Sequence, residues 1–152
     1  MGAAVSELAR QDFAFFHPLR VRWAEVDRQG IVFNAHYLAY ADIALTEYMR
    51  AIGFPYPDGL ISLGSDLFAV RSELNFRGSA RYDEQLELAT RVSRIGRTSM
   101  TLIIGIFRGE ELLCDVTLIY VNASHETQKP MPVPPTFIDA ITAFETVPPE
   151  RP

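Results

Sequence analysis

The sequence predicts a two-layer α+β domain in which one long helix packs on an antiparallel sheet of about five strands. A single long stretch, about residues 35–52, carries a helical apolar stripe. Four strand-like stretches follow without a helix between them, which favours hairpins over parallel strands. The 152 residues are 48% apolar, enough for one domain with a substantial core. We expect that domain over 13–146, with loose ends at 1–12 and 147–152.

The first strand is predicted from alternation between Phe15 and Trp23. Apolar and charged side chains take turns along this stretch, which is typical of a half-buried strand. The apolar face comprises Leu19, Val21 and Trp23, and the charged face comprises Arg20 and Arg22.

The long helix follows, from about Ala35 to Ile52. Asn34 is a typical N-cap residue, and Gly53 with Pro55 is a typical helix end. The side chains expected to face the core are Leu38, Ala41, Leu45, Tyr48, Met49 and Ile52.

Four more strands and a short terminal helix complete the predicted order. The proline-rich segment 130–135 leads into a helix over about 136–144. One long helix covers only part of such a sheet, so its free edge or face predicts dimerisation. The last two strands are apolar on both faces, which favours central or interface positions. The four strands are Leu67–Arg77, Gln85–Arg94, Ser99–Arg108 and Glu111–Asn122.

Composition excludes several classes of function. The net charge is −5 and the basic residues are scattered, so no nucleic-acid surface is expected. No stretch is long enough to span a membrane, and the N-terminal residues lack the apolar core of a signal peptide. The single Cys114 excludes an internal disulfide, and we expect a cytoplasmic protein. The myristoylation-like match at Met1–Ser6 is a weak motif.

The loop between the first strand and the helix carries the candidate chemistry. A carboxylate at Asp27, ionised at neutral pH, precedes the helix start at Asn34. Such a carboxylate can drive attack on an activated carbonyl while free helix N–H groups bind the oxyanion. On spacing alone, an Asp at position 27 is most often a turn or capping residue, and His36 is equally a surface histidine. No further ligand at a recognisable spacing completes a metal site, and no Gly-x-Ser-x-Gly motif is present.

This loop resembles that of the hotdog-fold acyl-CoA thioesterases of the 4-hydroxybenzoyl-CoA thioesterase-like family. The resemblance extends roughly from Leu19 to Phe144. It implies a hotdog fold, hydrolysis of acyl-CoA to a free acid and coenzyme A, and dimers or tetramers with sites between subunits. No cofactor is implied, because coenzyme A is part of the substrate. The matching residues are Asp27, Gly30-Ile31-Val32-Phe33-Asn34, His36-Tyr37 and Glu47–Arg50, with support from Phe76–Glu84 and Pro130–Pro134.

The resemblance also implies residue roles. Asp27 would act as nucleophile or as a base for water, and the backbone N–H of Asn34 would polarise the thioester carbonyl. His36 would orient Asp27 or contact the substrate, and Glu47 is interpreted as a structural or interface charge. Further candidates for substrate binding are Gly30 at the turn, Phe33 and Tyr37 along an acyl or pantetheine channel, and Arg77, Arg94 and Arg97 for the phosphates of coenzyme A.

Two other classes of function stay open. One is a hotdog dehydratase or hydratase, and the other is an acyl-CoA-binding protein without catalysis. The sequence determines neither the acyl group nor the choice between dimer and tetramer. It also leaves open an acyl carrier protein in place of coenzyme A.

Overall fold

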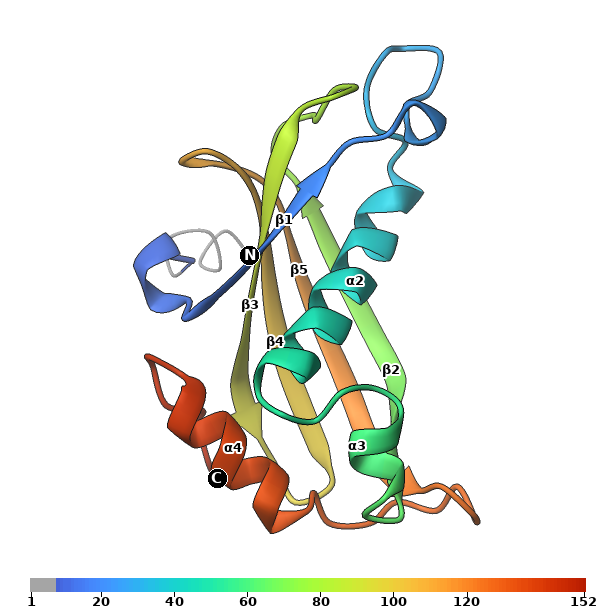
Figure 1. The fold of residues 1–152 in the computed structure, drawn as a ribbon, viewed down its shortest axis with the longest axis vertical. Helices are drawn as coiled ribbons and strands as arrows, with labels where there is room; N and C mark the ends of the chain where they lie inside the picture. The colour runs from blue at the N-terminus through green and yellow to red at the C-terminus, as the bar shows by residue number, and fades with distance from the viewer. Residues whose placement is uncertain (1–7) are drawn as a thin grey trace.

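The structure, a computed structural model, describes residues 8–152, so the Met1–Ser6 motif lies outside the described residues. Five antiparallel strands form one sheet in the order β1-β3-β4-β5-β2, and α2 lies along one face of it (Figure 1). This arrangement is the predicted hotdog fold. The strands are β1 (Phe15–Arg20), β2 (Ser65–Phe76), β3 (Gln85–Ile95), β4 (Ser99–Arg108) and β5 (Glu111–Ser124).

The helices are unequal in length. The long α2 (Ala35–Ala51) confirms the predicted helix, and α4 (Pro135–Phe144) is the predicted short terminal helix. A single turn, α3 (Asp58–Ile61), and two 3-10 turns, η1 (Arg10–Asp12) and η2 (Trp23–Glu25), complete the order. None of the described helices is long and apolar enough to cross a membrane.

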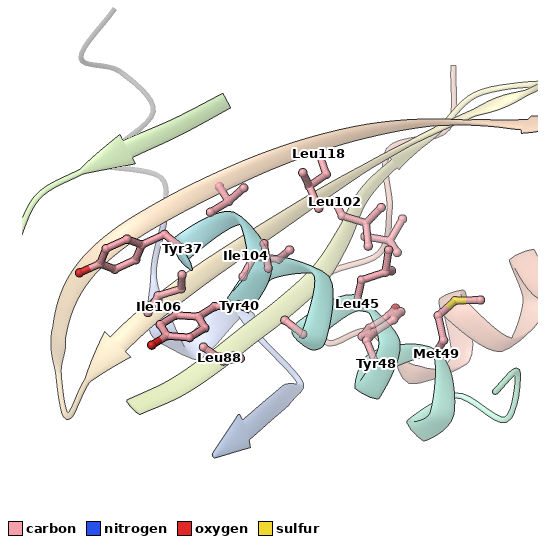
Figure 2. Close-up of a cluster of buried hydrophobic side chains, with 14 of the residues drawn as sticks. Tyr37, Tyr40, Leu45, Tyr48, Met49, Leu88, Leu102, Ile104, Ile106 and Leu118 are labelled. Carbon is pink, nitrogen blue, oxygen red and sulfur yellow. The ribbon is translucent and has the colours of Figure 1, made fainter. Parts of the chain in front are cut away.

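The core lies between α2 and the middle of the sheet (Figure 2). Three tyrosines of the helix are buried with the aliphatic residues of β3, β4 and β5. The predicted stripe is confirmed except at Leu38, which is 41% exposed because the buried face is turned toward Tyr37 and Tyr40. The buried residues of α2 are Tyr37, Tyr40, Ala41, Ala44, Leu45, Tyr48 and Met49.

The edge strand β2 differs from its predicted alternation. Its register against β5 shifts between Ala69 and Arg71, so that Val70 is an extra residue, as in a β-bulge. Leu74 therefore lies opposite the core residue Val116, whereas Phe68 lies opposite Val121 on the other face. The prediction that Phe68, Val70, Leu74 and Phe76 share one face is wrong for that reason.

Both ends of the described chain are attached to the sheet. The guanidinium of Arg10 lies 4.5 Å from the ring centre of Phe16 and pairs with Glu87. At the other end, Glu150 exchanges backbone hydrogen bonds with Ser93 and Ile95 at 2.8 and 3.0 Å. These contacts differ from the loose ends predicted at 8–12 and 147–152.

The residue after α4 ties the terminal helix to the core. The buried carboxylate of Glu145 accepts hydrogen bonds from the Tyr48 hydroxyl at 2.6 Å and the Val92 N–H at 2.9 Å. Phe137 and Ile141 of α4 are fully buried. The C-terminal helix is therefore fixed to both α2 and β3.

Glu145 predicts a pH-dependent stability. Burial raises the pKa of this carboxyl, and the bonds from Tyr48 and Val92 oppose the shift only in part. The folded chain then keeps a proton that the unfolded chain, with a pKa of about 4.3, has lost. Stability from this group is present below about pH 4.3 and is lost as the pH rises through the raised folded pKa.

The test compares the wild type with Glu145→Gln, whose amide oxygen can accept both hydrogen bonds without titrating. Urea unfolding between about pH 4 and pH 8 should show the wild type losing free energy of unfolding relative to the variant. A difference that does not change with pH would contradict the prediction.

Candidate active site

The Asp27 loop is closed by its own backbone. The N–H of Asp27 donates to the Ile31 carbonyl, and the N–H of Gly30 donates to the Asp27 carbonyl, each at 2.9 Å. Gly30 has a φ of 79°, a left-handed conformation that favours glycine. One carboxylate oxygen of Asp27 accepts the Gln29 N–H at 2.8 Å. The turn therefore holds the half-buried carboxylate at the base of the loop.

The start of α2 presents free backbone donors. The Asn34 carbonyl accepts the Tyr37 N–H at 3.2 Å, whereas the N–H groups of Asn34 and Ala35 have no backbone acceptor within residues 8–152. Unsatisfied N–H groups at a helix start, reinforced by the helix dipole, favour a negatively charged oxygen.

The predicted side-chain cap at Asn34 is wrong. Asn34 already has helical torsions, with φ −55° and ψ −33°, and its side chain makes no capping hydrogen bond. A capping side chain reaches the helix N–H groups from an extended backbone, which Asn34 does not have. Its side chain is therefore not expected to stabilise the helix in the way a cap does.

Backbone bonds join the loop to the helix start. The Phe33 N–H donates to the Glu25 carbonyl at 2.9 Å, and a β-bridge pairs Val26 with Val32. Asp27 directly follows Val26 in the chain, and Asn34 directly follows Phe33. The loop carboxylate and the free helix donors thus belong to one connected piece of structure.

A shallow hollow of about 500 Å³ opens beside Asp27. Trp23 and Tyr82 form one wall of it, 72% and 50% exposed, with ring centres 5.1 Å apart. The prediction that Trp23 lies on the buried face of the first strand is wrong, because β1 ends at Arg20 and Trp23 begins the turn η2. The lining residues are Trp23, Val26, Asp27, Arg28, Gly30 and Tyr82.

A second, longer hollow runs between α2 and strands β2 and β5. Its upper part, about 420 Å³, begins at Ala35, next to the free helix donors, and its lower part is about 390 Å³. The two parts share Asp42, Ala69 and Tyr120, so we treat them as one groove. The other lining residues are Leu38, Ala39, Ser72 and Leu118 in the upper part, and Leu45, Thr46, Met49, Tyr56 and Leu67 in the lower part.

Three aromatic candidates lie around the helix start. The His36 ring lies edge-on to the Phe33 ring with centres 6.3 Å apart, and no hydrogen bond links His36 to Asp27 in the described chain. Phe33 is 48% exposed. Tyr37 is buried and its hydroxyl accepts the Ala80 N–H at 3.0 Å, so its ring lies in the core and lines neither hollow.

Two of the three predicted arginines, Arg94 and Arg97, lie far from Asp27 within one chain. Arg77 forms an ion pair with Asp115 at 3.2 Å. The Asp27 loop follows the end of β1 near Gln85, whereas Arg94 lies nine residues further along β3, about 30 Å away at the rise of a strand. Arg97 lies in the turn beyond it. Within one chain the structure does not bring Arg94 and Arg97 to Asp27.

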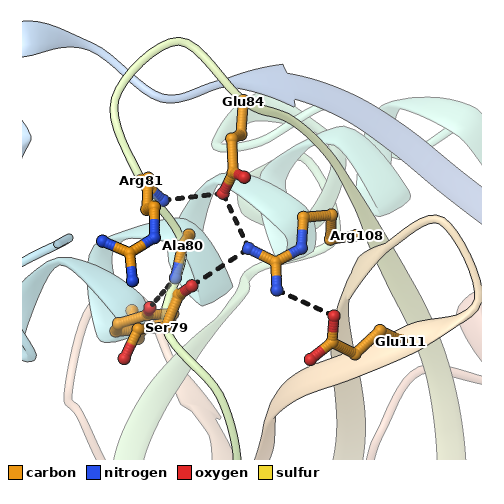
Figure 3. Close-up of polar contacts among 7 residues, drawn as sticks. Ser79, Ala80, Arg81, Glu84, Arg108 and Glu111 are labelled. Atoms are coloured by element: carbon orange, nitrogen blue, oxygen red, sulfur yellow. Dashed lines mark hydrogen bonds and ion pairs between the residues drawn. The ribbon is translucent and has the colours of Figure 1, made fainter.

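A different arginine lies beside the loop. Arg81 forms a β-bridge with Ile31, and this contact joins two segments that are distant in sequence. Arg108 holds the segment, donating to Glu84 at 2.8 Å and to the Ser79 carbonyl at 3.1 Å, while Glu84 also accepts the Arg81 N–H (Figure 3). Arg81 is not among the predicted substrate-binding arginines, because it stands in a link without periodicity, although the Phe76–Glu84 segment around it supports the resemblance.

Residues 8–152 contain no group of three His, Cys, Asp or Glu side chains that could hold a metal ion. Cys114 is buried, and burial raises the pKa of its thiol to about 12. A thiol that stays protonated is a poor nucleophile.

Known proteins share this architecture. The Thioesterase superfamily model matches residues 29–115, more than half of the chain. The acyl-CoA thioester hydrolase YbgC of Escherichia coli is 26% identical over 125 residues, 82% of this chain and 92% of that protein. A putative esterase of Aquifex aeolicus is 25% identical over 111 residues, 73% of this chain and 82% of that protein.

A solved structure agrees with these relatives. The DHNA-CoA thioesterase of Staphylococcus aureus has the same fold, with a TM-score of 0.75 at 22% identity, covering 82% of this chain and 86% of that one. The family match places the chain among enzymes that hydrolyse thioesters. The chain belongs to the Thioesterase superfamily and is a thioester hydrolase with the hotdog fold.

Proposed function

We propose that this enzyme hydrolyses an acyl-CoA thioester to a free acid and coenzyme A at the Asp27 loop. The observation that carries the proposal is the connection of that loop to the start of α2. It holds a carboxylate and unpaired N–H groups in one backbone-bonded unit. The name of the E. coli relative, an acyl-CoA thioester hydrolase, supports coenzyme A as the carrier.

In the proposed reaction Asp27 either attacks the thioester carbonyl or removes a proton from the attacking water. The carbonyl oxygen becomes negative in both routes, and the Asn34 N–H donates to it. The C–S bond then breaks, and the coenzyme A thiolate takes up a proton. On the nucleophilic route, water finally hydrolyses the acyl-aspartyl anhydride and restores the carboxylate.

The groove along α2 is a suitable site for the acyl group. Its upper part begins at Ala35, one residue beyond the proposed oxyanion donor, and continues past Leu38 and Ala39. An acyl chain whose carbonyl lies at the helix start can extend into it. We therefore propose this groove, rather than the buried Tyr37, as the acyl site.

Thiol release tests the proposed function. A panel of aromatic, short-chain and long-chain acyl-CoA thioesters is incubated with the enzyme, and free coenzyme A is measured with a thiol reagent. We expect release from at least one class, and an acyl carrier protein thioester in the same assay tests the carrier. Hydration of an enoyl-CoA without thiol release would favour a hydratase, and binding without turnover would favour an acyl-binding protein.

We also propose that the protein dimerises through the edge of β2. This strand exposes Phe68, Val70 and Phe76, with 60% of Val70 accessible. A long apolar edge strand with unpaired backbone groups favours pairing with a second chain.

Val70→Glu should therefore produce a monomer, because it places a charge in the apolar edge that would pair, and thioesterase activity should fall if the sites lie between subunits. Sedimentation equilibrium measures whether each variant is a monomer or a dimer. Thr142→Glu adds the same charge at an exposed position of α4 and should stay dimeric and active. A Val70→Glu protein that still dimerises would contradict this interface.

A further inference from the structure

Glu25 lies two residues before Asp27 and is bonded on three sides. Its carboxylate oxygen accepts the Arg22 N–H and the Tyr40 hydroxyl, both at 2.8 Å. Its backbone carbonyl accepts the Phe33 N–H at 2.9 Å. The side chain is only 14% exposed. Glu25 is thus bonded both through its side chain and through its main chain.

Tyr40 supplies the bond from α2. It is fully buried, and its ring lies edge-on to that of Tyr37 with centres 5.9 Å apart (Figure 2). Burial, together with the hydrogen bond to Glu25 and its charge, raises the pKa of the Tyr40 hydroxyl. The hydroxyl therefore stays protonated and donates to Glu25 throughout the working pH range.

The segment around Glu25 is consequently attached at two separate points, one just before α2 and one within it. The Glu25 carbonyl is bonded at Phe33, immediately before the proposed oxyanion donor, and the Glu25 side chain is bonded at Tyr40, almost two turns along the helix. A loop held at one point can pivot, whereas two separated bonds remove that rotation. Without Tyr40, the backbone contacts at Phe33 and Val32 would remain, and both lie before the helix begins.

We infer that Glu25 and Tyr40 are a positioning pair, which sets the orientation of Asp27 toward the helix start. The inference rests on the proposed function. Neither side chain is assigned to the reacting atoms, because one Glu25 carboxylate oxygen accepts both donors and the other lies 3.8 Å from the Arg22 guanidinium. A small displacement of a reacting group can cost up to about 10²-fold in rate, so a loosened loop should be visible in kcat.

The experiment measures kcat, KM and the melting temperature of three variants with the best acyl-CoA of the panel. Tyr40→Phe removes only the hydroxyl and should lower kcat about 10-fold with little change in KM. Glu25→Gln keeps an oxygen acceptor for both donors and should stay near the wild type, whereas Glu25→Ala, which also loses the Arg22 N–H bond, should lower kcat at least as far as Tyr40→Phe. The double variant Tyr40→Phe/Glu25→Ala should have the same kcat as Glu25→Ala, since both substitutions remove the same Tyr40–Glu25 bond.

Tyr48→Phe is the matched control. It removes a comparable buried bond to a glutamate from the same helix, at the end remote from the loop, and should lower the melting temperature without lowering kcat. An unchanged kcat in Tyr40→Phe, or an equal fall in Tyr48→Phe, would overturn the inference. Glu25→Gln as inactive as a variant lacking the Asp27 carboxylate would also overturn it. If Asp27→Asn itself keeps full activity, the proposed function fails instead.

Discussion

Asp27→Asn should lower kcat for acyl-CoA hydrolysis by about 10²–10⁴-fold. Asparagine has the shape of aspartate and keeps the oxygen that accepts the Gln29 N–H, so the turn should persist. The amide, however, neither attacks a thioester nor accepts a proton from water at neutral pH. Steady-state kinetics and the melting temperature measure the two effects separately, and we expect kcat to fall at an unchanged melting temperature.

The matched control is Asp139→Asn, the same chemical change on the exposed side of α4. This variant should keep wild-type kcat. If Asp27→Asn hydrolyses acyl-CoA as fast as Asp139→Asn, then Asp27 is only a turn residue and the chemistry lies elsewhere. An equal fall in both variants would point to an effect of net charge.

Phe137→Ala should lower the free energy of unfolding by about 3–5 kcal/mol, the cost of removing a fully buried aromatic ring. Phe137 is 0% exposed, and its ring lies edge-on to Phe54 with centres 5.1 Å apart. It is one of the side chains with which α4 closes the end of the core. Denaturant unfolding gives the free energy directly.

Thr136→Ala, at the preceding exposed position, is the control and should change stability by less than about 0.5 kcal/mol. A loss below about 1 kcal/mol in Phe137→Ala would mean that the cavity collapses or that α4 contributes little. In that case the terminal helix would be a peripheral element rather than part of the core.

The sequence patterns predicted most of the fold because helices and hairpins depend mainly on residues that are near each other in the chain. The spacing of apolar residues determines which face of α2 is buried, and the turns between strands favour hairpins. The pattern failed where the backbone leaves regular geometry. An extra residue at Val70 reverses the faces of β2, and the early end of β1 exposes Trp23.

The candidate site likewise contains residues that the sequence could bring together and residues that only the folded sheet brings together. Asp27 and Asn34 are close in sequence, so a single loop could be expected to bring them together. Arg81 and Tyr82 reach the loop through the bridge to Ile31, and only the folded sheet determines that pairing. Arg94 lies about 30 Å from the loop within one chain, since a position at a strand end does not say which end lies beside the loop.

The bond between Tyr48 and Glu145 spans 97 residues of sequence. Contacts of such long separation form late, because the intervening chain must first be ordered. A nascent chain that has reached a point between residues 52 and 144 contains the whole Asp27 loop and α2. It still lacks Glu145, the residue that bonds Tyr48 at the far end of this helix. The order of synthesis therefore leaves the far end of α2 without this bond until Glu145 has emerged and docked.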